Sequence, residues 1–298
     1  MRADRLIPAA LVLALGLAAL LIGTADDVAA WAASWQREFQ NGLAGALRAL
    51  QAGDPGATLT VLSLCFAYGF VHAAGPGHGK FLIGGYGVGS AVKLRTLALV
   101  ALASSLGQAM TAVGLVALGF GLFGISREAL TDMADGHLAV VSFGAIGAIG
   151  LWLMIRGMRH LRRQTPAVHH HDHAHHEACG CGHAHAPSPD DLARAGGARD
   201  IAALIGAIAI RPCTGALFLL VIAWYIDLPW IGIAGAFAMG FGTAAVTILV
   251  AILATSSRQA ILTGLSDNPR LARLGPILEI CAGAAVILIA AQAIALQI

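Results

Sequence analysis

Long apolar runs, separated by short polar segments, restrict what this chain can fold into. A helix rises 1.5 Å per residue, so about 20 apolar residues are needed to cross a hydrocarbon core about 30 Å thick. Charged residues make up only 11% of the chain, whereas a soluble domain carries roughly a quarter. We therefore predict an all-α integral membrane protein with six or seven transmembrane helices. The candidate spans are 6–23, 57–92, 96–124, 137–158, 200–226, 229–255 and 275–297.

The N-terminal part of the chain contains an anchor and an amphipathic segment. Stretch 6–23 resembles a signal peptide, but its apolar run is long for one, which favours a retained transmembrane anchor. Residues 28–52 then place apolar side chains at three- and four-residue steps, a pattern typical of an amphipathic helix at the membrane interface. The side chains of this stripe are Trp31, Trp35, Phe39, Leu43, Leu47 and Leu50.

Basic residues are distributed unevenly between the predicted loops. A cytoplasmic N-terminus puts thirteen Lys and Arg inside and three outside, as the positive-inside rule requires. The loop 159–199 is therefore predicted to be cytoplasmic. The net charge is only +2, which argues against a nucleic-acid partner. The inside set is Arg2, Arg5, Lys93, Arg95, Arg156, Arg159, Arg162, Arg163, Arg194, Arg199, Arg258, Arg270 and Arg273, and the outside set is Arg37, Arg48 and Arg127.

Two of the predicted spans contain a helix break. A Gly-Pro-Gly run within residues 72–80 interrupts the span 57–92, because a helix does not continue through such a density of glycine and proline. Residues 211–215 interrupt the span 200–226 and repeat the P-x-x-G core of the first break. Two glycine pairs keep nearly the same offset along the chain, Gly107 with Gly242 and Gly147 with Gly283. We predict two inverted three-helix repeats, typical of a transporter whose site lies near the membrane midplane.

The cytoplasmic loop contains a tract rich in metal ligands. Most of the chain's twelve histidines fall within residues 169–185, beside two thiols and two carboxylates. Imidazole and thiolate groups bind Ni²⁺, Co²⁺, Zn²⁺ and Cu²⁺, and without a rigid frame they do so with little selectivity. We predict that the tract captures metal. Its candidate ligands are His169, His170, His171, Asp172, His173, His175, His176, Cys179, Cys181, His183 and His185.

A second group of candidate ligands lies at the helix breaks. His72 and His78 flank the first break, and polar groups at that depth are costly, so we predict that they bind the transported ion. Cys213, at the second break, is either a further soft ligand or a small buried apolar residue. Arg211 and Glu279 are interpreted as structural charges, held in ion pairs or reaching the interface.

These motifs resemble those of a known family. The segment H-A-x-x-P-G-H-x-K at residues 72–80, the P-C pair at 212–213 and the His-rich loop between the two halves are similar to NicO-type nickel/cobalt efflux proteins. The likeness covers about 57–298. It implies a multi-pass permease of the bacterial inner (plasma) membrane that moves Ni²⁺ and Co²⁺, with His72 and His78 as the metal-handling pair.

The prediction is therefore a transporter, not an enzyme, that exports Ni²⁺ and Co²⁺ from the cytoplasm by alternating access. It needs no prosthetic group, and its partners are the metal ions and the lipid bilayer; its oligomeric state, a homo-oligomer included, is left open. Alternatives are a nickel/cobalt importer supplying metalloenzymes, a zinc transporter, and a membrane thiol electron carrier. The last requires paired cysteines at the two breaks, and Gly77 stands opposite Cys213 in the repeat alignment.

Five segments follow from this interpretation. They are a transmembrane anchor or signal-like segment 1–25, a periplasmic amphipathic segment 26–56, transmembrane repeat 57–158, the His-rich cytoplasmic loop 159–199 and transmembrane repeat 200–298.

Overall fold

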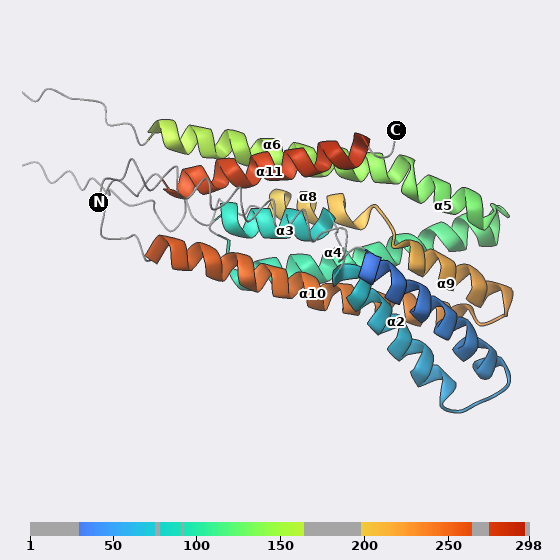
Figure 1. Ribbon diagram of the computed structural model, residues 1–298. Coiled ribbons are helices and arrows are strands. Elements are labelled where there is room, and N and C mark those ends of the chain that lie inside the picture. The colour runs from blue at the N-terminus through green and yellow to red at the C-terminus, as the bar shows by residue number, and fades with distance from the viewer. Residues whose placement is uncertain (1–29, 75–77, 91, 164–197, 264–273, 296–298) are drawn as a thin grey trace, which may run out of the picture.

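A computed structural model of the chain describes residues 30–74, 78–90, 92–163, 198–263 and 274–295 (Figure 1). Within these ranges every regular element is a helix, which confirms the predicted all-α class. A helix over 30–51 comes first. The others are α2 (Ala57–Ala74), α3 (His78–Gly89), α4 (Leu94–Leu115), the π-helical η1 (Val116–Leu122), α5 (Arg127–Asp135), α6 (His137–Arg163), α8 (Ala198–Ala209), α9 (Thr214–Tyr225), α10 (Pro229–Thr263) and α11 (Leu274–Ala295).

Six of the predicted spans reappear as apolar helices, so the protein is a multi-pass membrane protein. Five helical stretches are long and apolar enough to cross a membrane on their own: Ala57–Ala74, Leu94–Leu122, Glu128–Arg162, Pro229–Gln259 and Leu274–Ala295. A sixth is the pair α8 and α9, which bends by 60° at its break. The predicted anchor 6–23 lies outside the described residues.

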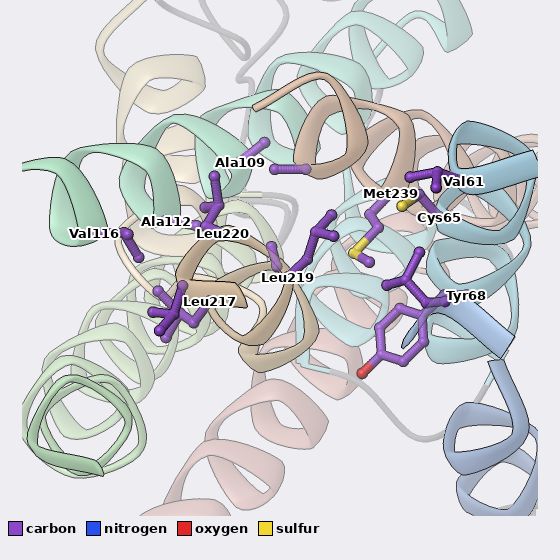
Figure 2. Packing of buried hydrophobic residues seen from close by; sticks show 14 of the residues in the cluster. Val61, Cys65, Tyr68, Ala109, Ala112, Val116, Leu217, Leu219, Leu220 and Met239 are labelled. Atoms are coloured by element: carbon purple, nitrogen blue, oxygen red, sulfur yellow. The ribbon is translucent and has the colours of Figure 1, made fainter. Parts of the chain in front are cut away.

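The long helices form a bundle in which segments from the two halves of the chain alternate (Figure 1). Helix α6 packs along α11, while α10 packs against both α2 and α4, and α8 packs against α4. The packed interior is continuous from α2 to α9. Figure 2 shows Met239 of α10 beside Cys65 and Tyr68 of α2, with Leu219 and Leu220 of α9 between them and α4.

Glycines allow two of these helix pairs to approach closely. A Cβ atom at Gly242 of α10 would lie 2.2 Å from the carbonyl oxygen of Phe66 in α2. A Cβ atom at Gly107 of α4 would lie 2.6 Å from the Cβ of Ala209 in α8. Neither distance is sterically possible, so the packing of α10 on α2 and of α4 on α8 depends on the missing side chains.

The helix over residues 30–51 packs along α2 as an antiparallel hairpin (Figure 1). Leu43 and Leu47 are each 3% exposed and belong to the same packed cluster as the buried face of α2. Trp31 and Trp35 are 49% and 40% exposed, whereas Ala32 is buried. The predicted amphipathic helix is therefore present. In its N-terminal half, however, the buried face is shifted by one residue, so that Ala32 is buried in place of the predicted Trp31. Its position at the membrane interface stays a prediction.

The ends of the helices fall into two groups. One group lies toward the left of the bundle in Figure 1. It contains the C-terminal ends of α3, α6 and α10 and the N-terminal ends of α4, α8 and α11. Helix α5, the start of α6 and the turn between α9 and α10 lie toward the opposite end. We call these the basic end and the hairpin end, because the first contains Arg95, Arg159 and Arg162, and the second contains the turn of the N-terminal hairpin.

Candidate metal site at two helix breaks

Helices α2 and α3 lie on either side of the Gly-Pro-Gly run, whose residues 75–77 are outside the described ones. Helix α2 ends at Ala74 and α3 begins at His78. The ammonium of Lys80, in the first turn of α3, donates a hydrogen bond to the carbonyl oxygen of Ala73. The last carbonyls of a helix have no partner within the helix, so Lys80 satisfies one of them and ties the two half-helices together.

The second break separates α8 from α9, and Cys213 occupies the N-cap position of α9. The final carbonyl groups of α8 need donors from elsewhere, and polar side chains of α4 and α6 supply them. This arrangement explains how a broken backbone is tolerated at membrane depth, where every polar group must be satisfied internally. The bonds run from Ser142 Oγ to Ala207 O (2.6 Å), from Gln108 Nε2 to Ile208 O (3.2 Å) and from Thr111 Oγ1 to Ala209 O (2.8 Å).

The two breaks meet at a cavity of about 210 Å³, which we call the central cavity. Its wall is polar for a membrane interior, and one group in it stands out. Ser104 of α4 is 1% exposed, and its hydroxyl has no hydrogen-bond partner within the described part of the chain. A buried hydroxyl of this kind is usually satisfied by water or a ligand. The polar side chains of the wall are His72, Lys80, Ser104, Ser105, Gln108, Asp135, Ser142, Arg211, Cys213, Thr214, Thr243 and Thr247.

His72 and Cys213 come together in this cavity, although 141 positions of sequence numbering separate them. The imidazole of His72 and the thiol of Cys213 are hydrogen-bonded to each other. The ring of Tyr68 stacks on the imidazole, with centroids 5.9 Å apart and an interplanar angle of 7°. A nitrogen donor and a soft sulfur donor therefore face the same space, a combination suited to Ni²⁺, Co²⁺ and Zn²⁺.

The remaining predicted ligands lie beyond what the structure describes. The backbone of His78 begins α3, but its side chain is not among the described ones, and the tract 169–185 falls between α6 and α8 outside the described ranges. Among the described residues, no group of three or more His, Cys, Asp or Glu side chains is arranged to hold a metal ion. The described part of the chain thus supplies one imidazole and one thiol, those of His72 and Cys213, at this site.

Both charges that we interpreted as structural are found in ion pairs. Arg211 Nη2 lies 3.1 Å from Asp135 Oδ1, and this pair lines the central cavity toward the hairpin end. Glu279 of α11 is 3% exposed and pairs with Arg156 of α6, while His160 Nδ1 lies 3.2 Å from its other oxygen. The first pair fixes the second break, and the second joins α6 to α11 near the basic end.

Sequence reasoning missed the residues that surround His72 from the N-terminal helix. Gln36 Oε1 lies 3.5 Å from His72 Nδ1, and the side chain of Gln40 is hydrogen-bonded to that of Tyr68. A signal was present, because Gln36 and Gln40 fall on the same helix face as the buried Ala32 and Leu43, where they interrupt an apolar stripe.

Comparison with known proteins agrees with the chemistry of this site. Residues 58–180 match the sequence model of the NicO family, described as "High-affinity nickel-transport protein". The chain is also 29% identical over 225 residues to a Haemophilus influenzae protein named "Putative nickel/cobalt efflux system", which covers 71% of this chain and 70% of the relative. No solved structure matches the chain. Both similarities are to nickel/cobalt transport proteins, and the family model is that of the NicO family, which the chain's motifs also resemble.

Proposed function

We propose that this protein exports Ni²⁺ and Co²⁺ from the cytoplasm across the bacterial inner membrane. The observation that carries the proposal is the meeting of His72 and Cys213 in a cavity between two helix breaks, in a chain similar to nickel/cobalt transport proteins. Discontinuous helices that meet near the middle of a bundle are the usual setting of a transporter's substrate site. His78, at the start of α3, is the further proposed ligand, and Zn²⁺ is a competing substrate.

The donors account for the proposed choice of substrate. A thiol must lose its proton to bind a metal, so occupation of the site would turn Cys213 into an anionic ligand. That charge would offset part of the repulsion from Lys80 and Arg211, which also line the cavity. Imidazole and thiolate bind Ni²⁺, Co²⁺ and Zn²⁺ much better than Mg²⁺ or Ca²⁺, which prefer oxygen ligands.

We infer that alternating access occurs between two inverted repeats, 57–158 and 200–298. The contacts of two equivalent glycines support this relation. Gly242 gives α10 its close contact with α2, and Gly107 gives α4 its close contact with α8. Each glycine thus packs against a helix of the other repeat, namely the helix that precedes the break in that repeat. Such reciprocal contacts are expected if the two halves of the chain are related repeats. Rocking of one half against the other would expose the central cavity to alternate sides.

The orientation of the protein is part of the proposal. The basic end contains most of the described Arg and Lys residues assigned to the inside, and the positive-inside rule then makes it cytoplasmic. The tract 169–185 lies in the sequence between α6 and α8, whose ends meet at that side. An exporter gains most from metal ligands there, because free nickel and cobalt are scarce in the cytoplasm and capture limits loading.

The direction of transport is tested in cells and in everted membrane vesicles. Expression in a metal-sensitive bacterium is expected to raise tolerance to Ni²⁺ and Co²⁺ and to lower their steady-state cell content, while everted vesicles accumulate ⁶³Ni²⁺. The His72→Ala protein at equal membrane abundance is the control for unspecific effects of expression. Increased accumulation with greater sensitivity would instead establish an importer that uses the same site.

A second prediction assigns the His-rich tract to capture. Excision of residues 169–185 is expected to raise the Ni²⁺ concentration for half-maximal transport severalfold and to leave the maximal rate nearly unchanged. The reason is that a tethered cluster of ligands raises the local ion concentration without forming the conduction path. The measurement is initial uptake rate against metal concentration in everted vesicles. A protein that stays inactive at saturating Ni²⁺ would show that the tract belongs to the path itself.

A further inference from the structure

The N-terminal hairpin reaches the metal site. Its helix 30–51 runs antiparallel to α2 with Leu43 and Leu47 buried in the shared packing, so its register against α2 is fixed. In that register Gln40 lies at the level of Tyr68, and Gln36 at the level of His72, one turn further along both helices. Two amide side chains of this helix therefore face the cavity side of α2.

These contacts hold the His72 imidazole from three directions. Gln36 Oε1 is 3.5 Å from its Nδ1 atom, the Tyr68 ring stacks on its face, and the Cys213 thiol is hydrogen-bonded to it. The Tyr68 ring is itself immobilised, because a Cβ atom at Gly215 of α9 would lie 2.3 Å from it. The imidazole thus has little freedom to rotate.

The contact to Gln36 has a chemical consequence. When the Nδ1–H group of a neutral imidazole donates a hydrogen bond to an acceptor, the lone pair resides on Nε2, which is then the metal-binding atom. We propose that Gln36 is the positioning residue that selects this state of His72 for metal binding, so that the N-terminal helix is part of the transport site. This inference rests on the proposed function, because it assigns to Gln36 a role exerted through the proposed ligand His72.

The test compares two substitutions at one position in the full-length protein reconstituted into liposomes. Gln36→Leu removes the acceptor, and outer partners of metal ligands are typically worth about 10–100-fold in affinity. We therefore expect the half-saturating Ni²⁺ concentration to rise about tenfold, with a much smaller change in the maximal rate. Gln36→Glu retains an acceptor of similar size and is expected to stay close to the original protein.

A spectroscopic measurement reports on the ligand directly. Co²⁺ bound to a thiolate gives a charge-transfer band, and the part of this band that disappears in Cys213→Ser belongs to the site. In Gln36→Leu, the Cys213-dependent absorption is expected to appear only at a higher Co²⁺ concentration. The matched control is Gln51→Leu, the same substitution at an exposed position of the same helix, which is expected to change neither measurement.

Each outcome has a defined meaning. Equal losses in Gln36→Leu and Gln36→Glu would overturn the inference, because packing and not the acceptor would then be responsible. An unchanged half-saturating concentration in Gln36→Leu, combined with inactivity of His72→Ala, would also overturn it while leaving the proposed function intact. If His72→Ala itself transported normally, the proposed metal site would be wrong.

Discussion

Replacing His72 with alanine is expected to lower the rate of Ni²⁺ transport by more than about 100-fold, because even an outer partner of a metal ligand is typically worth 10–100-fold. An ion in the central cavity has been stripped of much of its water, and within a membrane no bulk solvent replaces a lost ligand. Among the described residues, His72 and Cys213 supply the imidazole and the thiol in the wall of this cavity. Loss of one therefore removes half of that set. The measurement is ⁶³Ni²⁺ uptake into everted vesicles.

The same experiment decides the role of Cys213, which sequence reasoning leaves open between a ligand and a buried apolar residue. As a ligand, Cys213→Ala lowers transport as severely as His72→Ala; as a small packing residue, it is nearly silent. Matched controls are His137→Ala and Cys281→Ser, since both side chains are exposed and neither lines the central cavity. Transport by His72→Ala at the wild-type rate and at normal membrane abundance would show that the substrate site lies elsewhere. This conclusion requires that both control variants are active.

The positions of the helix breaks could be predicted because they depend on local sequence. Apolar runs of sufficient length identify spans, and a Gly-Pro-Gly run or the Arg211-Pro212 pair interrupts a helix whatever surrounds it. The structure accordingly ends α8 at Ala209, while residues 75–77 of the first break lie outside the described ones. The sequence also placed His72 and Cys213 at these breaks, and the meeting of the breaks at one cavity brings the two side chains together.

The partners of buried polar groups could not be predicted because they depend on packing between distant segments. Asp135 falls in the sequence between the predicted spans 96–124 and 137–158, yet it pairs with Arg211 at the central cavity. Gln36 lies in a helix whose stripe was centred on Trp31 and Trp35, and a rotation of about one residue decides whether Gln36 faces His72. Hydrophobic periodicity does not fix a helix rotation that closely.

Replacing Glu279, which lies at the contact between α6 and α11, is expected to lower the stability of the protein strongly. Removing one partner of a buried ion pair costs about 3–5 kcal/mol, because the other charge is left without compensation. The side chains of Glu279 and Arg156 are 4% and 16% exposed. In Glu279→Ala, Arg156 would lose the carboxylate with which it forms this ion pair. Thermal unfolding in detergent micelles is therefore expected to show a marked loss of stability.

The double variant distinguishes loss of the pair from loss of packing. Replacing both Glu279 and Arg156 by leucine removes the two charges and retains apolar volume. Such replacements of a buried ion pair often change the stability little. We expect this double variant to be more stable than Glu279→Ala, with a clear coupling energy between the two positions. Glu38→Ala is the control, since its carboxylate is exposed on the helix 30–51. Additive losses at Glu279 and Arg156 would contradict the pair's role. The contact between α6 and α11 would then depend on apolar packing and on close approach at small residues such as Gly283, where a Cβ atom would lie 2.6 Å from the carbonyl oxygen of Gly150.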